Sequence, residues 1–173
     1  QRRLVILEQK GWIAKGLNGD VNPGLISAVL LHPNAVADSM FLREDTREAM
    51  HVEWQLCRSI LLEIARSARQ LSARLLLLII PQAYQVDPAC VEQLNEFGCL
   101  SMPEMLENRT MNNLLVEFCR EQDIHCLDPL AQFRAETASG NQFYYPIDSH
   151  LNTDGQQLLG ELLAEKIEQI LGE

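Results

Sequence analysis

Near the end of this 173-residue chain, a carboxylate and a histidine stand close enough in sequence to work as a proton-transfer pair. Asp148 precedes His150 by two positions. Such a histidine can take a proton from a hydroxyl nucleophile and return it to a leaving group, while the aspartate fixes the imidazole tautomer. The alternative is that Asp148 caps a turn and His150 is a surface loop residue. The spacing alone does not separate these two interpretations.

The pair stands just ahead of a predicted helix. Thr153 and Gln156 match a T-x-x-Q capping box, which predicts that the helix starts at Thr153. Apolar residues then recur at helical spacing: Leu158, Leu159, Leu162, Leu163, Ile167, Ile170 and Leu171. His150 is therefore expected in the loop immediately before this C-terminal helix.

The D-x-H-x-N-x-x-G pattern at residues 148–155, with its following helix, resembles the last conserved block of the SGNH (GDSL-like) hydrolases. Residues 74–88 are similar to a buried strand and loop in the branch that includes polysaccharide O-acetyltransferases and related esterases. Residues 124–130 resemble the next strand of that branch, so the resemblance covers about residues 70–173. It implies a Ser-His-Asp mechanism with His150 as general base, Asp148 as its partner, and a glycine and an asparagine as oxyanion donors.

The nucleophile that this resemblance implies, a serine in a Gly-Asp-Ser motif, does not occur in the sequence. Ser39 follows Ala-Asp rather than Gly-Asp, and it neither follows a clear strand nor opens a helix as a nucleophile elbow does. An apolar run at residues 4–8 indicates a buried strand almost at residue 1, so we expect the serine to come from sequence outside this chain. Asn18 and Asn22 are candidate oxyanion residues by resemblance, but asparagines beside glycine and proline are also typical turn formers.

Apolar runs alternate with amphipathic segments along the chain, which predicts an α/β fold with a mainly parallel sheet covered on both faces. Together with the resemblance, this indicates a three-layer sandwich of the SGNH or flavodoxin-like kind, forming one domain over residues 1–173. Strands are expected at residues 4–8, 26–32, 75–80 and 124–127; helices are expected over residues 50–71, from Thr110, and from Thr153. In parallel sheets chemistry gathers at the carboxyl ends of the strands, so the loop with His150 should reach that edge.

A long loop is expected between Asp128 and the Asp148–His150 pair. Long loops in compact domains are often functional, and Phe143, Tyr144 and Tyr145 could form an apolar or sugar-stacking wall there. The alternative is that these aromatic side chains anchor the loop to the sheet, which we favour for Phe143.

Charge and composition limit the partners. The net charge of −10 and the pI near 4.8 disfavour binding to nucleic acids and anionic membrane surfaces. No apolar run is long enough to span a bilayer. No metal site is expected, because His125 is flanked by positions that point to opposite faces of a strand and the other histidines lack ligand-spaced partners.

The cysteines bear on the compartment. Five cysteines without a C-x-x-C spacing favour a reducing, cytoplasmic environment. Cys90 and Cys99 could pair if the protein were exported, so an extracytoplasmic location stays open.

The sequence therefore predicts an ester hydrolase or O-acyltransferase that needs no cofactor. Its substrate, implied by the resemblance, is an O-acyl ester, such as an O-acetyl ester, of a small molecule or a carbohydrate. The alternative is a non-catalytic binding or interaction module that keeps the fold and the loop. The strand at residues 4–8 is apolar on both faces, so self-association through this region is also expected.

Overall fold

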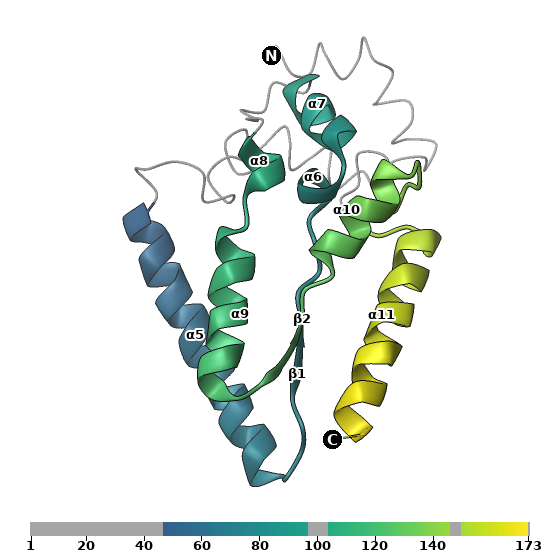
Figure 1. Ribbon diagram of the computed structural model, residues 1–173. Helices are drawn as coiled ribbons and strands as arrows, with labels where there is room; N and C mark the ends of the chain where they lie inside the picture. The colour runs from purple at the N-terminus through teal and green to yellow at the C-terminus, as the bar shows by residue number, and fades with distance from the viewer. Residues whose placement is uncertain (1–46, 97–103, 146–149, 173) are drawn as a thin grey trace, which may run out of the picture.

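The computed structural model describes residues 47–96, 104–145 and 150–172 of the chain (Figure 1). The predicted strands at residues 4–8 and 26–32 lie outside these residues. The described elements, in chain order, are α5 (Arg47–Gln70), β1 (Leu76–Leu78), α6 (Ala83–Val86), α7 (Pro88–Glu96), α8 (Glu104–Glu107), α9 (Thr110–Gln122), β2 (His125–Leu127), α10 (Leu130–Ala138) and α11 (Thr153–Gly172).

The two described strands are parallel neighbours. Leu76, Leu77 and Leu78 pair with His125, Cys126 and Leu127, and one further hydrogen bond runs from the Ile79 amide to the Leu127 carbonyl (2.9 Å). Both strands are shorter than the predicted segments at residues 75–80 and 124–127. The described part of the fold is thus mostly helical, with a small parallel α/β unit in which β1 is followed by α6, α7, α8 and α9, and α9 leads into β2.

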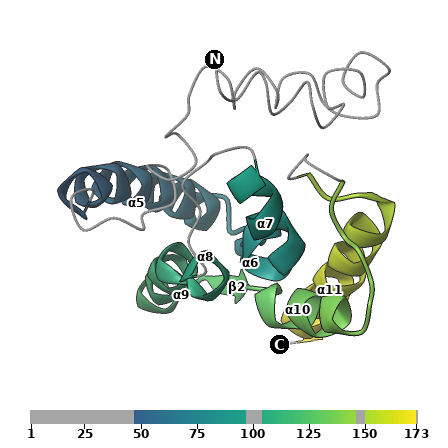
Figure 2. The same cartoon turned by 90° about the horizontal axis from the view of Figure 1, so that it is seen from above.

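Helices lie on both sides of this strand pair. Figures 1 and 2 show α5 and α9 on one side and α11 on the other, while α6, α7, α8 and α10 gather beyond the carboxyl ends of the strands. Among the helices that the structure describes, none combines the length and the apolar character needed to cross a membrane.

Local backbone geometry produces the sharp reversals between these helices and strands. Ser72, just after α5, has φ 54°, and Asp123, which caps α9, has φ 53°. Aspartate tolerates this left-handed conformation better than most residues with a side chain. The Asp123 amide donates to the last turn of α9 at Cys119, so the chain enters β2 within two residues.

The core at the carboxyl ends of the strands joins α6, α10 and the approach to α11. Val86, Leu130, Phe133 and Phe143 form its buried centre. Leu130 and Phe133 have no exposed surface, and the rings of Phe133 and Phe143 pack edge to face with their centroids 5.1 Å apart. Leu151, Leu158, Leu159 and Leu162 pack against this cluster, which fixes the start of α11.

The prediction of a long loop after Asp128 is wrong in part, because this segment contains the helix α10. This helix is short, and its two buried residues, Leu130 and Phe133, are too few to produce a clear helical repeat. Its start is supported by Asp128, whose Oδ1 accepts a hydrogen bond from the Leu130 amide (3.2 Å). The short helices α6 and α8, four residues each, were likewise absent from the predicted elements.

Candidate functional site

The loop that carries His150 is closed at its base by backbone contacts. Tyr144 and Leu151 form an isolated antiparallel bridge, and the Tyr145 amide donates a hydrogen bond to the His150 carbonyl (3.1 Å). The positions between these two ends include Asp148. The base therefore brings Tyr145 and His150 next to each other, and residues 146–149 between them lie outside the described part of the chain.

Tyr144 fastens this base to the end of β1. Its hydroxyl donates to the Pro81 carbonyl at 2.8 Å, and Pro81 follows β1 by three residues. Burial raises the pKa of the Tyr144 hydroxyl, and the nearby Cys90 adds to that effect. The hydroxyl therefore stays protonated and available as a donor at neutral pH, and the base of the loop lies at the carboxyl end of the strand.

Asn152 connects the same loop to α11. Its Oδ1 accepts a hydrogen bond from the Gly155 amide (2.9 Å), its Nδ2 donates to the Gln142 carbonyl (2.8 Å), and its own amide donates to the Phe143 carbonyl (2.9 Å). Asn152 is thus the N-cap of the helix, so the predicted cap at Thr153 is wrong by one residue. Thr153 is the first helical residue instead, and Gln156 reaches back to the Leu151 carbonyl (3.1 Å).

Gly155 allows the loop and the helix to approach each other. A Cβ atom at this position would lie 2.3 Å from the Phe143 carbonyl oxygen, far inside van der Waals contact. Any other residue would push the start of α11 away from the segment before Tyr144. Two residues of the D-x-H-x-N-x-x-G pattern, Asn152 and Gly155, therefore position the loop that carries the other two.

The three aromatic residues before the loop differ in their surroundings. Phe143 is 6% exposed and Tyr144 packs against Phe133 with ring centroids 6.3 Å apart, so both anchor the loop to the core. Phe143 thus anchors the loop, as the sequence interpretation favoured, but its partners in the core are Val86, Leu130 and Phe133 of α6 and α10. Tyr145 is 49% exposed and is the one member of the three that could contact a bound ligand.

The predicted site residues can be placed only in part. His150 is exposed at the base of the loop and is engaged in interactions there. Asp148, Asn18, Asn22 and Ser39 lie outside the described residues. The hydrogen bond expected between Asp148 and His150 therefore stays a prediction.

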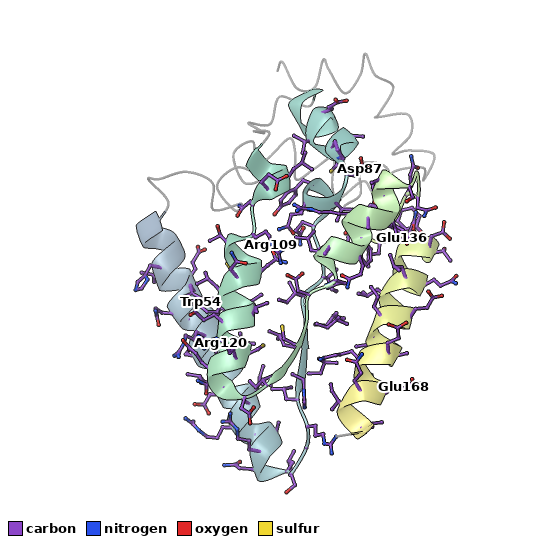
Figure 3. All side chains as sticks on the ribbon, in the orientation of Figure 1. Trp54, Asp87, Arg109, Arg120, Glu136 and Glu168 are labelled. Carbon is purple, nitrogen blue, oxygen red and sulfur yellow. The ribbon has the colours of Figure 1, made fainter. Side chains whose placement is uncertain are left out.

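A second polar cluster lies at the carboxyl end of β2, and sequence reasoning missed it. Asp128 accepts hydrogen bonds from Arg109 (2.8 Å) and Asn112 (3.0 Å), and Asn112 in turn accepts one from Gln85 (3.0 Å). Figure 3 shows Arg109 at the start of α9, level with the ends of the strands. An aspartate directly after a buried strand was the available signal for this cluster.

The hydrogen bonds of this cluster hold elements of the fold together. Asn112 and Gln85 are 3% and 7% exposed, and the carboxylate of Asp128 also accepts a hydrogen bond from Leu130, the first residue of α10. Each of these buried polar groups has a partner, as buried polar groups require. The cluster therefore links α6, α9 and the start of α10 at the carboxyl end of β2.

An open groove of about 610 Å³ is lined by residues of α6, α7, α8 and α10. Asp87, Glu92 and Glu107 line it together with Arg134. Arg134 donates to the carbonyls of Gln85 and Leu106, so its guanidinium ties α10 to α6 and α8. Figure 3 shows Asp87 at the same end of the molecule as α10.

Possible metal ligands and the protonation state of the cysteines bear on which reactions the described residues could perform. Across the ranges that the structure describes, no three histidine, cysteine, aspartate or glutamate side chains are grouped to hold a metal ion. Cys57, Cys90, Cys119 and Cys126 are free thiols, whereas Cys99 lies outside those ranges. Burial, more than any neighbour, raises the pKa of Cys90 to about 11 and that of Cys119 to about 12, so neither is a thiolate at neutral pH.

Comparison with known proteins adds no assignment, because no family model matches the chain and neither a curated protein nor a solved structure shows significant similarity to it.

Proposed function

We propose that this chain belongs to an ester hydrolase or O-acyltransferase that acts on O-acyl esters, with O-acetyl esters of carbohydrates as the leading substrate class. The observation that carries the proposal is the attachment of the His150 loop to the carboxyl end of β1, through the hydrogen bond from Tyr144 to the Pro81 carbonyl. Catalytic groups of parallel α/β proteins collect at this edge. The class of substrate rests on the resemblance described from the sequence.

In the proposed mechanism His150 acts as the general base. It removes the proton from a serine hydroxyl as the oxygen attacks the ester carbonyl, and it then returns that proton to the leaving alkoxide. Asp148 holds the imidazole in the tautomer that can accept the proton and stabilises the imidazolium. Asn18 is proposed as an oxyanion donor; the serine itself is not assigned to a residue.

The arrangement of helices around the strand pair supports a three-layer sandwich as the fold of the whole domain. With α5 and α9 on one side of the strand pair and α11 on the other (Figure 2), a sheet extended by further parallel strands would form the middle layer of a three-layer sandwich. This is the architecture proposed for the whole domain.

The test is ester hydrolysis by the full-length protein encoded by the reading frame that contains this chain. We expect turnover of p-nitrophenyl acetate, and losses of roughly 100-fold to 10,000-fold in kcat for His150→Asn and Asp148→Asn, because each removes part of the proton relay. His51→Asn is the matched control, since His51 is an exposed histidine on α5, remote in sequence from the loop.

Two results would oppose the proposal. Full activity in His150→Asn would show that the loop histidine is not the base. If the unaltered full-length protein hydrolysed the ester no faster than buffer and bound no fluorophosphonate probe, the alternative of a non-catalytic binding module would be favoured.

A further inference from the structure

Two cysteine side chains meet between α9 and β2. Cys119 lies in the last turn of α9 and is 1% exposed, whereas Cys126 is the middle residue of β2 and is half-buried. Their thiols form a hydrogen bond with each other. The two sulfur atoms are therefore neighbours, which a disulfide requires because side chains that point apart cannot be joined without moving the backbone.

The turn after α9 produces this contact. The amides of Asp123 and Ile124 both donate to the Cys119 carbonyl, the second at 2.9 Å, so the chain reverses directly after the helix. The strand β2 then runs back along α9 (Figure 1) and packs against it. Within β2, Cys126 pairs with Leu77 of β1, which fixes its backbone as the helix fixes that of Cys119. The contact between the thiols is thus a consequence of the fold.

The surroundings of the pair give the two thiols different roles. Burial is the main reason that the pKa of both is raised, and it brings the pKa of Cys119 to about 12. Around Cys126, the hydrogen bond from Cys119 and the positive charge of Lys166 favour the thiolate, whereas the carboxylate of Asp128 opposes it. Cys126 is also the more exposed of the two. Cys126 is therefore the thiol that ionises first and meets an oxidant, and Cys119 is the resolving thiol beside it.

We propose that Cys119 and Cys126 are an oxidation site, at which hydrogen peroxide produces a reversible disulfide between α9 and β2. The Cys126 thiolate attacks one peroxide oxygen, the O–O bond breaks, and the leaving hydroxide takes up the proton that the thiol lost, which leaves a sulfenic acid on Cys126 and one water. The Cys119 sulfur then attacks the Cys126 sulfur. The S–O bond breaks, and the departing hydroxide takes the Cys119 proton as a second water. Two thiols are oxidised and one peroxide is reduced.

The disulfide adds a second link between elements that are already joined at another point. Arg109 and Asn112, near the start of α9, bond to Asp128 directly after β2. The disulfide joins the last turn of the same helix to the same strand, so oxidation fastens both ends of α9 to β2. The inference is independent of the proposed esterase chemistry, because neither cysteine belongs to the proton relay.

The test is a peptide map of the full 173-residue chain after treatment with hydrogen peroxide. Remaining thiols are blocked with N-ethylmaleimide in urea, and the monomer is digested with trypsin without reduction. The tryptic peptides of residues 110–120 and 121–134 each contain one cysteine, and we expect them to be joined and to be released by dithiothreitol. Cys126→Ser should abolish the joined product. Cys57→Ser, at another half-buried free cysteine, is the matched control and should leave the product unchanged.

A titration of the unaltered chain in glutathione redox buffers gives a second readout that needs no variant. The equilibrium constant for disulfide formation between the two peptides should be at least about 10-fold larger for the folded chain than for the chain in urea, because only the fold holds the thiols in contact. Equal constants would overturn the proposal. So would a Cys126 that stays a thiol or becomes a sulfinic acid without the joined peptides, or a Cys119 joined to a different cysteine.

Discussion

At the scale of single residues, one position in the candidate site leaves no space for a side chain, and that position is Gly155. The Phe143 carbonyl oxygen occupies the space where a side chain at position 155 would begin. Backbone cannot give way as the end of a flexible side chain can, so this position admits only glycine without a shift of the loop or the helix. The glycine of the motif is thus explained by packing.

Gly155→Ala should therefore lower the free energy of unfolding by about 1–3 kcal/mol, the usual cost of forcing an extra carbon into a packed site. Gly160→Ala is the matched control on the same helix, because nothing lies within 4 Å of a Cβ at position 160. It should raise stability by about 0.5–1 kcal/mol, since alanine loses less backbone freedom than glycine in a helix. Urea denaturation of both variants measures the difference, and equal stabilities would show that the close approach is absent in solution.

At the scale of elements, one buried side chain joins three parts of the fold. Asn112 on α9 accepts a hydrogen bond from Gln85 on α6 and donates one to Asp128, which follows β2 and accepts a hydrogen bond from the first residue of α10. The sequence indicated the helix from Thr110 but not this connection, because an asparagine in a helix reads as a surface residue until its neighbours are known. Asn112 is buried because α6 packs against α9 at this position.

We expect Asn112→Ala to destabilise the protein by about 1–3 kcal/mol, because it leaves buried groups on Gln85 and Asp128 short of a partner. The adjacent Asn113 is exposed, and Asn113→Ala should change the free energy of unfolding by no more than about 0.5 kcal/mol. Thermal and urea unfolding followed by circular dichroism would test the pair. Similar small effects for both substitutions would contradict a connecting role for Asn112.

At the scale of the whole molecule, buried thiols and phenols couple stability to alkaline pH. Burial raises the pKa of Cys90 from 9.0 to about 11, and that of Tyr84 from 10.0 to about 12. For each group the folded state holds its proton more tightly than the unfolded state does. The contribution to stability is complete below the unfolded pKa and is lost as the pH rises through the folded one.

The free energy of unfolding should therefore fall as the pH is raised from about 9 to about 11, and Cys90→Ala should make this fall shallower. Urea titrations between pH 7.5 and pH 11 under reducing conditions would measure the two slopes. Identical slopes for Cys90→Ala and the unaltered protein would show that the buried thiol does not contribute to the pH dependence.

The sequence by itself determined the elements whose physical cause is local. The helical repeat of apolar residues predicted the helices that became α5, α9 and α11. The apolar run at residues 75–80 and the mainly apolar segment at residues 124–127 predicted two strands, which pair in parallel. The N-cap of α11 was harder to predict, since Thr153 and Asn152 are both good cap residues. The hydrogen bond from the Gly155 amide to the Asn152 side chain shows that Asn152 is the cap.

Only the tertiary structure decided what depends on contacts between distant residues. Examples are the hydrogen bond from Tyr144 to Pro81, which spans 63 positions, and the cluster that joins Gln85 to Asp128. Short helices such as α10 also belong here, because two buried side chains are too few to mark a helix and the core around Phe133 stabilises it. Local patterns depend on neighbours in sequence, whereas a site assembled at a sheet edge depends on which strand ends the fold brings together.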